Sequence, residues 1–88
     1  MEYGDWSNPV IVDLDGIGHY AIITNALDAA NYMSEEWPVS GGPAVGEAVL
    51  VCLDAVLGMA SAEESREAFL EAAREAGLYV KPDSESFH

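Results

Sequence analysis

The spacing of the apolar residues changes near residue 25 from a period of two to a helical period, and this change restricts the fold more than any other feature. Val10, Val12 and Leu14 alternate with their neighbours, and residues 19–24 (HYAIIT) continue in strand-forming composition. Alternation indicates strands, whereas apolar residues at i, i+3 and i+4 indicate helices. The chain is therefore predicted to be α+β, with a β-hairpin followed by three helices.

Asp15-Gly16 supplies residues that tolerate the positive φ angles of a tight hairpin turn. A two-residue turn places Val12 opposite His19, and a four-residue loop over residues 15–18 shifts the partners by two. Both alternatives put the same residues on the face toward the helices, because a shift of two preserves the alternation. That face carries Val10, Val12, Leu14, His19, Ala21 and Ile23.

The first two helices follow the hairpin. Thr24-Asn25 offers an N-cap for the first helix, which ends near Glu36 because Pro38 disfavours helical geometry in the residue before it. Pro43 suits the first position of the second helix, which ends around Gly58. Since the second helix is apolar on most sides, we expect it to be the central and most buried element. Its inward stripe is Val45, Ala48, Val49, Cys52, Val56 and Met59.

Ser61 and Glu64 form a capping box that starts the third helix, and Gly77 is a suitable C-cap residue. Residues 78–81 (LYVK) have strand composition, so the topology is ββααα, or ββαααβ if they add an edge strand. A chain of 88 residues holds one core. The single domain is predicted over residues 9–81.

The two ends of the chain flank this domain. Residues 1–8 are predicted to be a lead-in that packs through one aromatic residue, Tyr3 or Trp6. Residues 82–88 are polar and are predicted to fray.

Sixteen acidic residues face three basic ones, giving a formal net charge of −13, and the first cation is Arg66. Binding to nucleic acid or to an anionic membrane requires several Lys or Arg contacts, so the charge argues against both. No apolar run is long enough to span a bilayer. Cys52 is the single cysteine, which excludes an intramolecular disulfide. We expect a soluble cytoplasmic protein.

The sequence contains no pattern typical of catalysis, of a cofactor or of a metal site. His19 lies on the hairpin face expected to pack against the helices, and Cys52 lies within an apolar stripe. Asp13, Asp15 and Gly16 resemble part of a calcium loop but provide too few oxygen ligands. We therefore expect a protein that is not an enzyme and that holds no cofactor.

Two surfaces are candidates for binding. The second hairpin face would expose an apolar strip suited to a homodimer or another protein partner, unless residues 1–8 fold over it. The loop after the first helix could instead form a small-molecule pocket. Arg66 either pairs with Glu63 on the surface or anchors a carboxylate from the first helix or a partner. The strip consists of Ile11, Tyr20 and Ile22, and the ligand loop of Trp37, Pro38, Gly41 and Gly42, with Arg66.

Several motifs together resemble a known family. They are residues 6–10 (WSNPV), Trp37-Pro38 followed by glycines, Ala48 with Cys52 and Leu57-Gly58, and the run from Ser65 to Leu78 that includes SREAFLEAA. In this order they are similar to the domain of unknown function 982 family, small proteins typical of rhizobia and related alphaproteobacteria. The resemblance covers about residues 6–80. It implies a small intracellular α+β domain and carries no catalytic residues with it.

Three hypotheses of function follow. The first is a non-enzymatic interaction or regulatory module that self-associates through the sheet. The second is a small-molecule binding protein that uses the loop from Trp37 to Gly42. The third is an acidic mimic of nucleic acid that occupies a basic DNA-binding partner.

Overall fold

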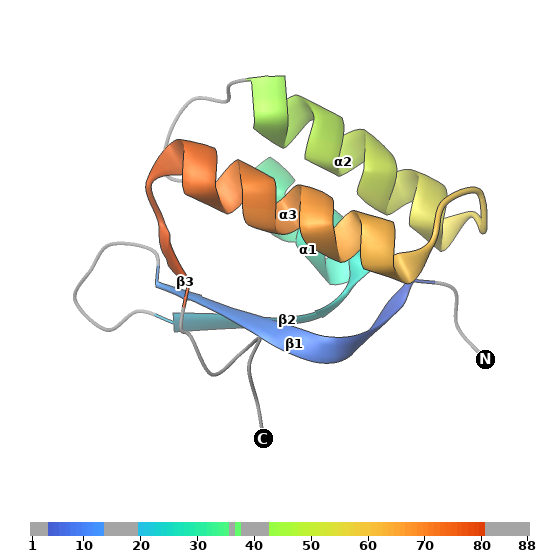
Figure 1. Ribbon diagram of the computed structural model, residues 1–88, viewed down its shortest axis with the longest axis horizontal. Coiled ribbons are helices and arrows are strands. Elements are labelled where there is room, and N and C mark those ends of the chain that lie inside the picture. Colours follow the sequence, from blue (N-terminus) through green and yellow to red (C-terminus); the bar gives the residue numbers. More distant parts are fainter. Residues whose placement is uncertain (1–3, 14–19, 36, 38–42, 81–88) are drawn as a thin grey trace.

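The computed structural model describes residues 4–13, 20–35, 37 and 43–80. Within these ranges the three strands form one antiparallel sheet in the order β2-β1-β3, and the helices lie on one side of it (Figure 1). The predicted α+β class is confirmed, and β3 settles the open question of the edge strand. The elements are β1 (Asp5–Asp13), β2 (Tyr20–Asn25), α1 (Ala26–Glu35), α2 (Pro43–Val56), α3 (Ala62–Ala76) and β3 (Tyr79–Val80).

The register of the hairpin follows the second of the two predicted alternatives. Val10 pairs with Ile23, and Val12 pairs with Ala21, which is the register that a four-residue loop produces. Val10, Val12 and Ile23 are buried, and Ala21 packs against the core. The predicted inward face is thus confirmed at these four positions. Leu14, His19 and the turn itself lie outside the described residues.

Strand β1 begins at Asp5 and not at Pro9, so the predicted lead-in over residues 1–8 is wrong from Asp5 onward. Asp5 pairs with Asn25, and an irregularity in register separates this pair from Val10. The Trp6 side chain is buried, and its Nε1 donates a hydrogen bond to Ser65 Oγ at 2.9 Å. The extra strand length places this indole in the core, on the helix side of the sheet.

Three of the predicted helix ends, the start of α1 and both ends of α3, are confirmed by their capping contacts. Asn25 Oδ1 accepts a hydrogen bond from the Asp28 amide at 2.8 Å at the start of α1. At the start of α3, Ser61 Oγ accepts from the Glu64 amide, and Glu64 Oε1 accepts from the Ser61 amide. Gly77 ends α3 with a φ of 77°, a conformation that a residue with a Cβ rarely adopts.

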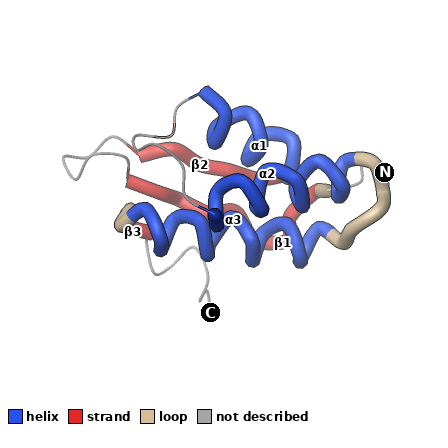
Figure 2. Tube along the Cα trace, turned by 90° about the horizontal axis from the view of Figure 1, so that it is seen from above, coloured by secondary structure: helices blue, strands red, loops and turns tan. Residues whose placement is uncertain are grey.

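Helices α1 and α3 lie between the sheet and α2, which rests on both of them (Figures 1 and 2). The inner side of α2 carries Ala48, Cys52 and Ala55, all fully buried. Its outer side faces away from the sheet, so the expectation that α2 is the most buried element is wrong. One stripe is enough to pack α2 against two helices, and the large apolar residues on its outer side and in the turn after it stay exposed. Their exposed fractions are 65% for Leu50, 42% for Leu53, 69% for Leu57 and 74% for Met59. Met59, which was predicted to lie on the inward stripe, is thus one of the exposed residues.

Candidate functional site

Trp37, the aromatic residue of the predicted ligand loop, is half-buried against the core. Its ring lies 5.8 Å from the ring of Phe69 and 5.9 Å from the ring of Tyr32, measured between centroids. These edge-to-face contacts stabilise the junction between α1 and α3. The other loop positions, Pro38, Gly41 and Gly42, lie outside the described residues.

Arg66 is only 7% exposed, and its Nε donates a hydrogen bond to the Asn8 carbonyl at 2.9 Å. Of the two alternatives for Arg66, the surface pair with Glu63 is therefore wrong. The guanidinium instead ties α3 to β1, across 58 positions of sequence. Because a backbone carbonyl carries no side-chain signature, nothing in the sequence pattern identifies this contact. The surface pair on α3 joins Arg74 and Glu71.

Cys52 is a core residue, as predicted. Its side chain is fully buried, and Sγ donates to the Ser65 carbonyl at 3.8 Å. Burial raises the pKa of the thiol from its ordinary value of 9.0 to about 11. Since the thiolate is the nucleophilic form, this cysteine is poorly suited to covalent chemistry near neutral pH. His19, the other residue considered for catalysis, lies outside the described residues.

The raised pKa of Cys52 predicts a loss of stability in alkali. Between pH 9.0 and about 11 the folded thiol keeps a proton that the unfolded thiol has released, so the free energy of unfolding falls as pH rises through this interval. We expect urea denaturation of the wild type to show a steeper decline there than Cys52→Ala, which lacks the thiol. Identical pH profiles for the two proteins would contradict the assignment.

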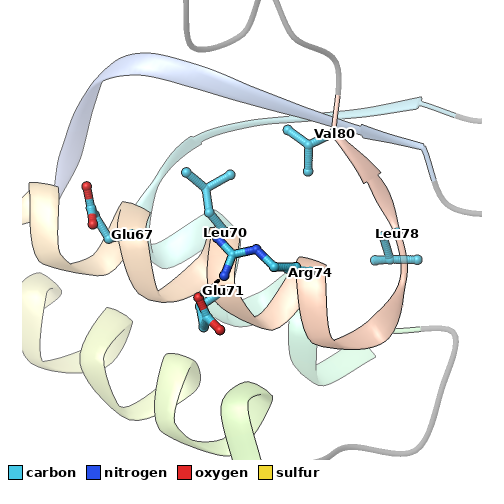
Figure 3. A pocket seen from close by; sticks show the side chains of 6 residues that line it. All are labelled: Glu67, Leu70, Glu71, Arg74, Leu78 and Val80. Atoms are coloured by element: carbon cyan, nitrogen blue, oxygen red, sulfur yellow. Dashed lines mark hydrogen bonds and ion pairs between the residues drawn. The ribbon is translucent and has the colours of Figure 1, made fainter.

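A hollow of about 430 Å³ opens between α3 and β3 (Figure 3). Leu70 and Val80 point into the space between α3 and the sheet, and the Arg74 side chain reaches along α3 to its ion pair with Glu71. A paired and exposed guanidinium is a weak anion-binding group. The hollow is lined by Glu67, Leu70, Glu71, Arg74, Leu78 and Val80.

The strip predicted on the second face of the hairpin is partly open. Tyr20 is half exposed, Ile22 is 62% exposed and Ile11 is half-buried. Trp6 packs on the opposite side of the sheet, so it does not cover this face. Tyr3 lies outside the described residues.

Among the described residues, the largest group of exposed apolar side chains lies on α2 and the turn after it, a surface not predicted from the sequence. We call Leu50, Leu53 and Leu57 the leucine stripe. The signal was present as excess apolar residues around α2, but it was assigned to the core. Beside α2 a shallow hollow faces the start of α3. Its lining is Val51, Met59, Ala60, Ser61, Glu63, Glu64 and Glu67.

In the described part of the chain, no helix is both long enough and apolar enough to cross a membrane. No three or more His, Cys, Asp or Glu side chains in that part come together in a way that could hold a metal ion.

Comparison with known protein families gives a match to this chain. The family described as "Protein of unknown function (DUF982)" matches residues 8–80. No curated protein matches the chain, and neither does any solved structure. The match covers most of the 88 residues and includes every helix described above. The chain therefore belongs to the DUF982 family of proteins of unknown function.

Proposed function

We propose that this protein is a non-enzymatic protein-interaction module of the cytoplasm. The observation that carries the proposal is the leucine stripe, which leaves three large apolar side chains in water along one side of α2 and the turn after it. Isolated exposed leucines are common on protein surfaces, but a contiguous group is typical of interfaces. The inner side of the same helix is fully packed, so the stripe is not needed to form the core.

The burial of the residues considered for chemistry supports the same proposal. Cys52 is enclosed and its thiol is protonated at neutral pH, and Trp37 is engaged with two other rings. Arg66 is held by β1. These contacts favour an interaction module over the small-molecule site that the loop suggested.

Cross-linking in the native cell tests the proposal. We expect the wild type to form a discrete cross-linked species that is strongly reduced in the double variant Leu50→Gln/Leu57→Gln. Replacing leucine by glutamine leaves the helix propensity and the net charge of the protein nearly unchanged and removes apolar surface. Leu27→Gln, which changes an exposed leucine of α1, is the matched control and should leave the species unchanged. Equal cross-linking in all three proteins would argue against α2 as an interface.

The sheet strip gives the proposal a second form, in which two copies associate through Tyr20 and Ile22. Light scattering across micromolar protein concentrations tests whether the protein forms this dimer. A dimer that Ile22→Thr converts to a monomer would support association through the sheet. A strict monomer would count against it.

A further inference from the structure

The leucine stripe has the spacing of a coiled-coil seam. Gly46, Leu50, Leu53 and Leu57 are separated by four, three and four positions, which matches alternating a and d positions of a heptad. All four residues are exposed. The Leu57 amide donates to the Leu53 carbonyl at 3.1 Å, so the helical turn continues as far as the last leucine. The three leucines thus offer knobs for a second helix along the outer side of α2 and the turn after it.

One border of this seam is acidic. Glu47 and Asp54 are exposed and follow Gly46 and Leu53 directly, which places both at the e position of the heptad. Leu50 is three positions after Glu47 and four before Asp54, so it is a neighbour of both on the helix surface. No Lys or Arg occurs in α2. We call Glu47 and Asp54 the acidic border.

The neighbouring hollow extends the negative charge. Met59 is 74% exposed at one end of α2, and Glu63, Glu64 and Glu67 line the same hollow from α3. A helix lying on the stripe would therefore find carboxylates along its flank on the α3 side. Charges at such flanking positions determine which partners a coiled-coil seam accepts.

The charge pattern argues against a second copy of this chain as the occupant. An antiparallel two-fold pairing of α2 would bring the acidic border of one copy toward the acidic border of the other. Each copy also has a formal net charge of −13, so any pairing meets strong mutual repulsion at low salt. A flank of Lys or Arg would instead be attracted.

From this complementarity, and resting on the proposed function, we infer that the leucine stripe binds an amphipathic helix of another protein. That helix presents apolar residues with heptad spacing to Leu50, Leu53 and Leu57, and Lys or Arg residues to the acidic border. Apolar contact supplies the affinity and the charges select the partner.

Three synthetic helices of three heptads each test this inference by calorimetry with the full chain. The probe has Leu at its a and d positions and Lys at e and g. The first control keeps Leu but has Glu at e and g, and the second keeps Lys but has Gln at a and d. We expect the probe to bind at least about tenfold more tightly than either control, because each control removes one of the two contributions. The affinity should fall several-fold from low to high salt without vanishing.

Variants of the protein locate the site. Leu50→Gln/Leu57→Gln should weaken binding of the probe by at least about tenfold, whereas Leu27→Gln should not. Glu47→Gln/Asp54→Asn should weaken it several-fold at low salt. The exposed pair Asp5→Asn/Glu35→Gln removes the same charge elsewhere and should have little effect. Circular dichroism confirms that each variant is folded.

Two results would overturn the inference. One is failure of the probe to bind, and the other is equal binding of the probe and the Gln control, which would reduce the association to charge alone. Neither result bears on the proposed function, which the cross-linking experiment judges separately. The probe could fail to bind while the cross-linked species still depends on Leu50 and Leu57. In that case the protein would be an interaction module whose partner is not a basic amphipathic helix.

Discussion

Cys52→Asp is expected to abolish the cooperative thermal unfolding transition at pH 7. The side chain at this position is fully buried between α2 and α3, and its Sγ donates a hydrogen bond to the Ser65 carbonyl, an acceptor that repels a carboxylate. An unpaired buried charge destabilises a protein by several kcal/mol, a large part of the total stability of a domain this small. Circular dichroism as a function of temperature measures the effect.

Two control variants separate the contributions at this position. Glu67→Gln changes an exposed residue of α3 and should leave the melting temperature nearly unchanged. Cys52→Ala removes volume without adding charge and should be destabilising but folded. Equal melting temperatures for Cys52→Asp and Glu67→Gln would contradict the placement of Cys52 in the core.

Phe69→Ala is the second variant with a large expected effect. Phe69 is fully buried and is the common neighbour of three aromatic rings, with centroid distances of 5.7 Å to Trp6, 6.3 Å to Tyr32 and 5.8 Å to Trp37. Truncation of a buried phenylalanine costs about 3–5 kcal/mol through lost burial and the cavity left behind. Urea denaturation followed by tryptophan fluorescence should show a correspondingly lower midpoint.

The conservative variant Phe69→Leu tests whether volume accounts for this loss. It fills most of the space and should cost less than about 1.5 kcal/mol. A loss below about 1 kcal/mol for Phe69→Ala would show that the aromatic cluster is not the centre of the core.

Local signals in the sequence predicted the elements well because they act over a few residues. The capping box of Ser61 and Glu64 provides hydrogen bonds to backbone amides within one helical turn. Gly77 ends α3 because its own backbone adopts a positive φ angle. The alternation of Val10 and Val12 determined which side of the hairpin is buried. It left the register open between two loop lengths, and the observed pairs follow the longer loop.

Contacts between distant residues were the part that sequence reasoning missed. The indole of Trp6 meets Ser65, and the guanidinium of Arg66 meets the Asn8 carbonyl, each across more than fifty positions. Because of the irregularity before Val10, the alternating pattern did not reveal that β1 begins at Asp5. The candidate site was missed for a related reason, since apolar residues around α2 are equally consistent with a buried helix and with an exposed seam.

By itself the sequence determined the class of the fold, the order of its elements, both ends of α3 and the inward face of the hairpin. Only the tertiary structure decided which helix became the outer layer, and therefore which leucines face water. The physical reason is that periodicity reports how apolar residues are arranged around one element. Whether a neighbouring element covers those residues depends on tertiary packing. Helices α1 and α3 pack directly on the sheet, so α2 packs on α1 and α3 and its outer side faces water.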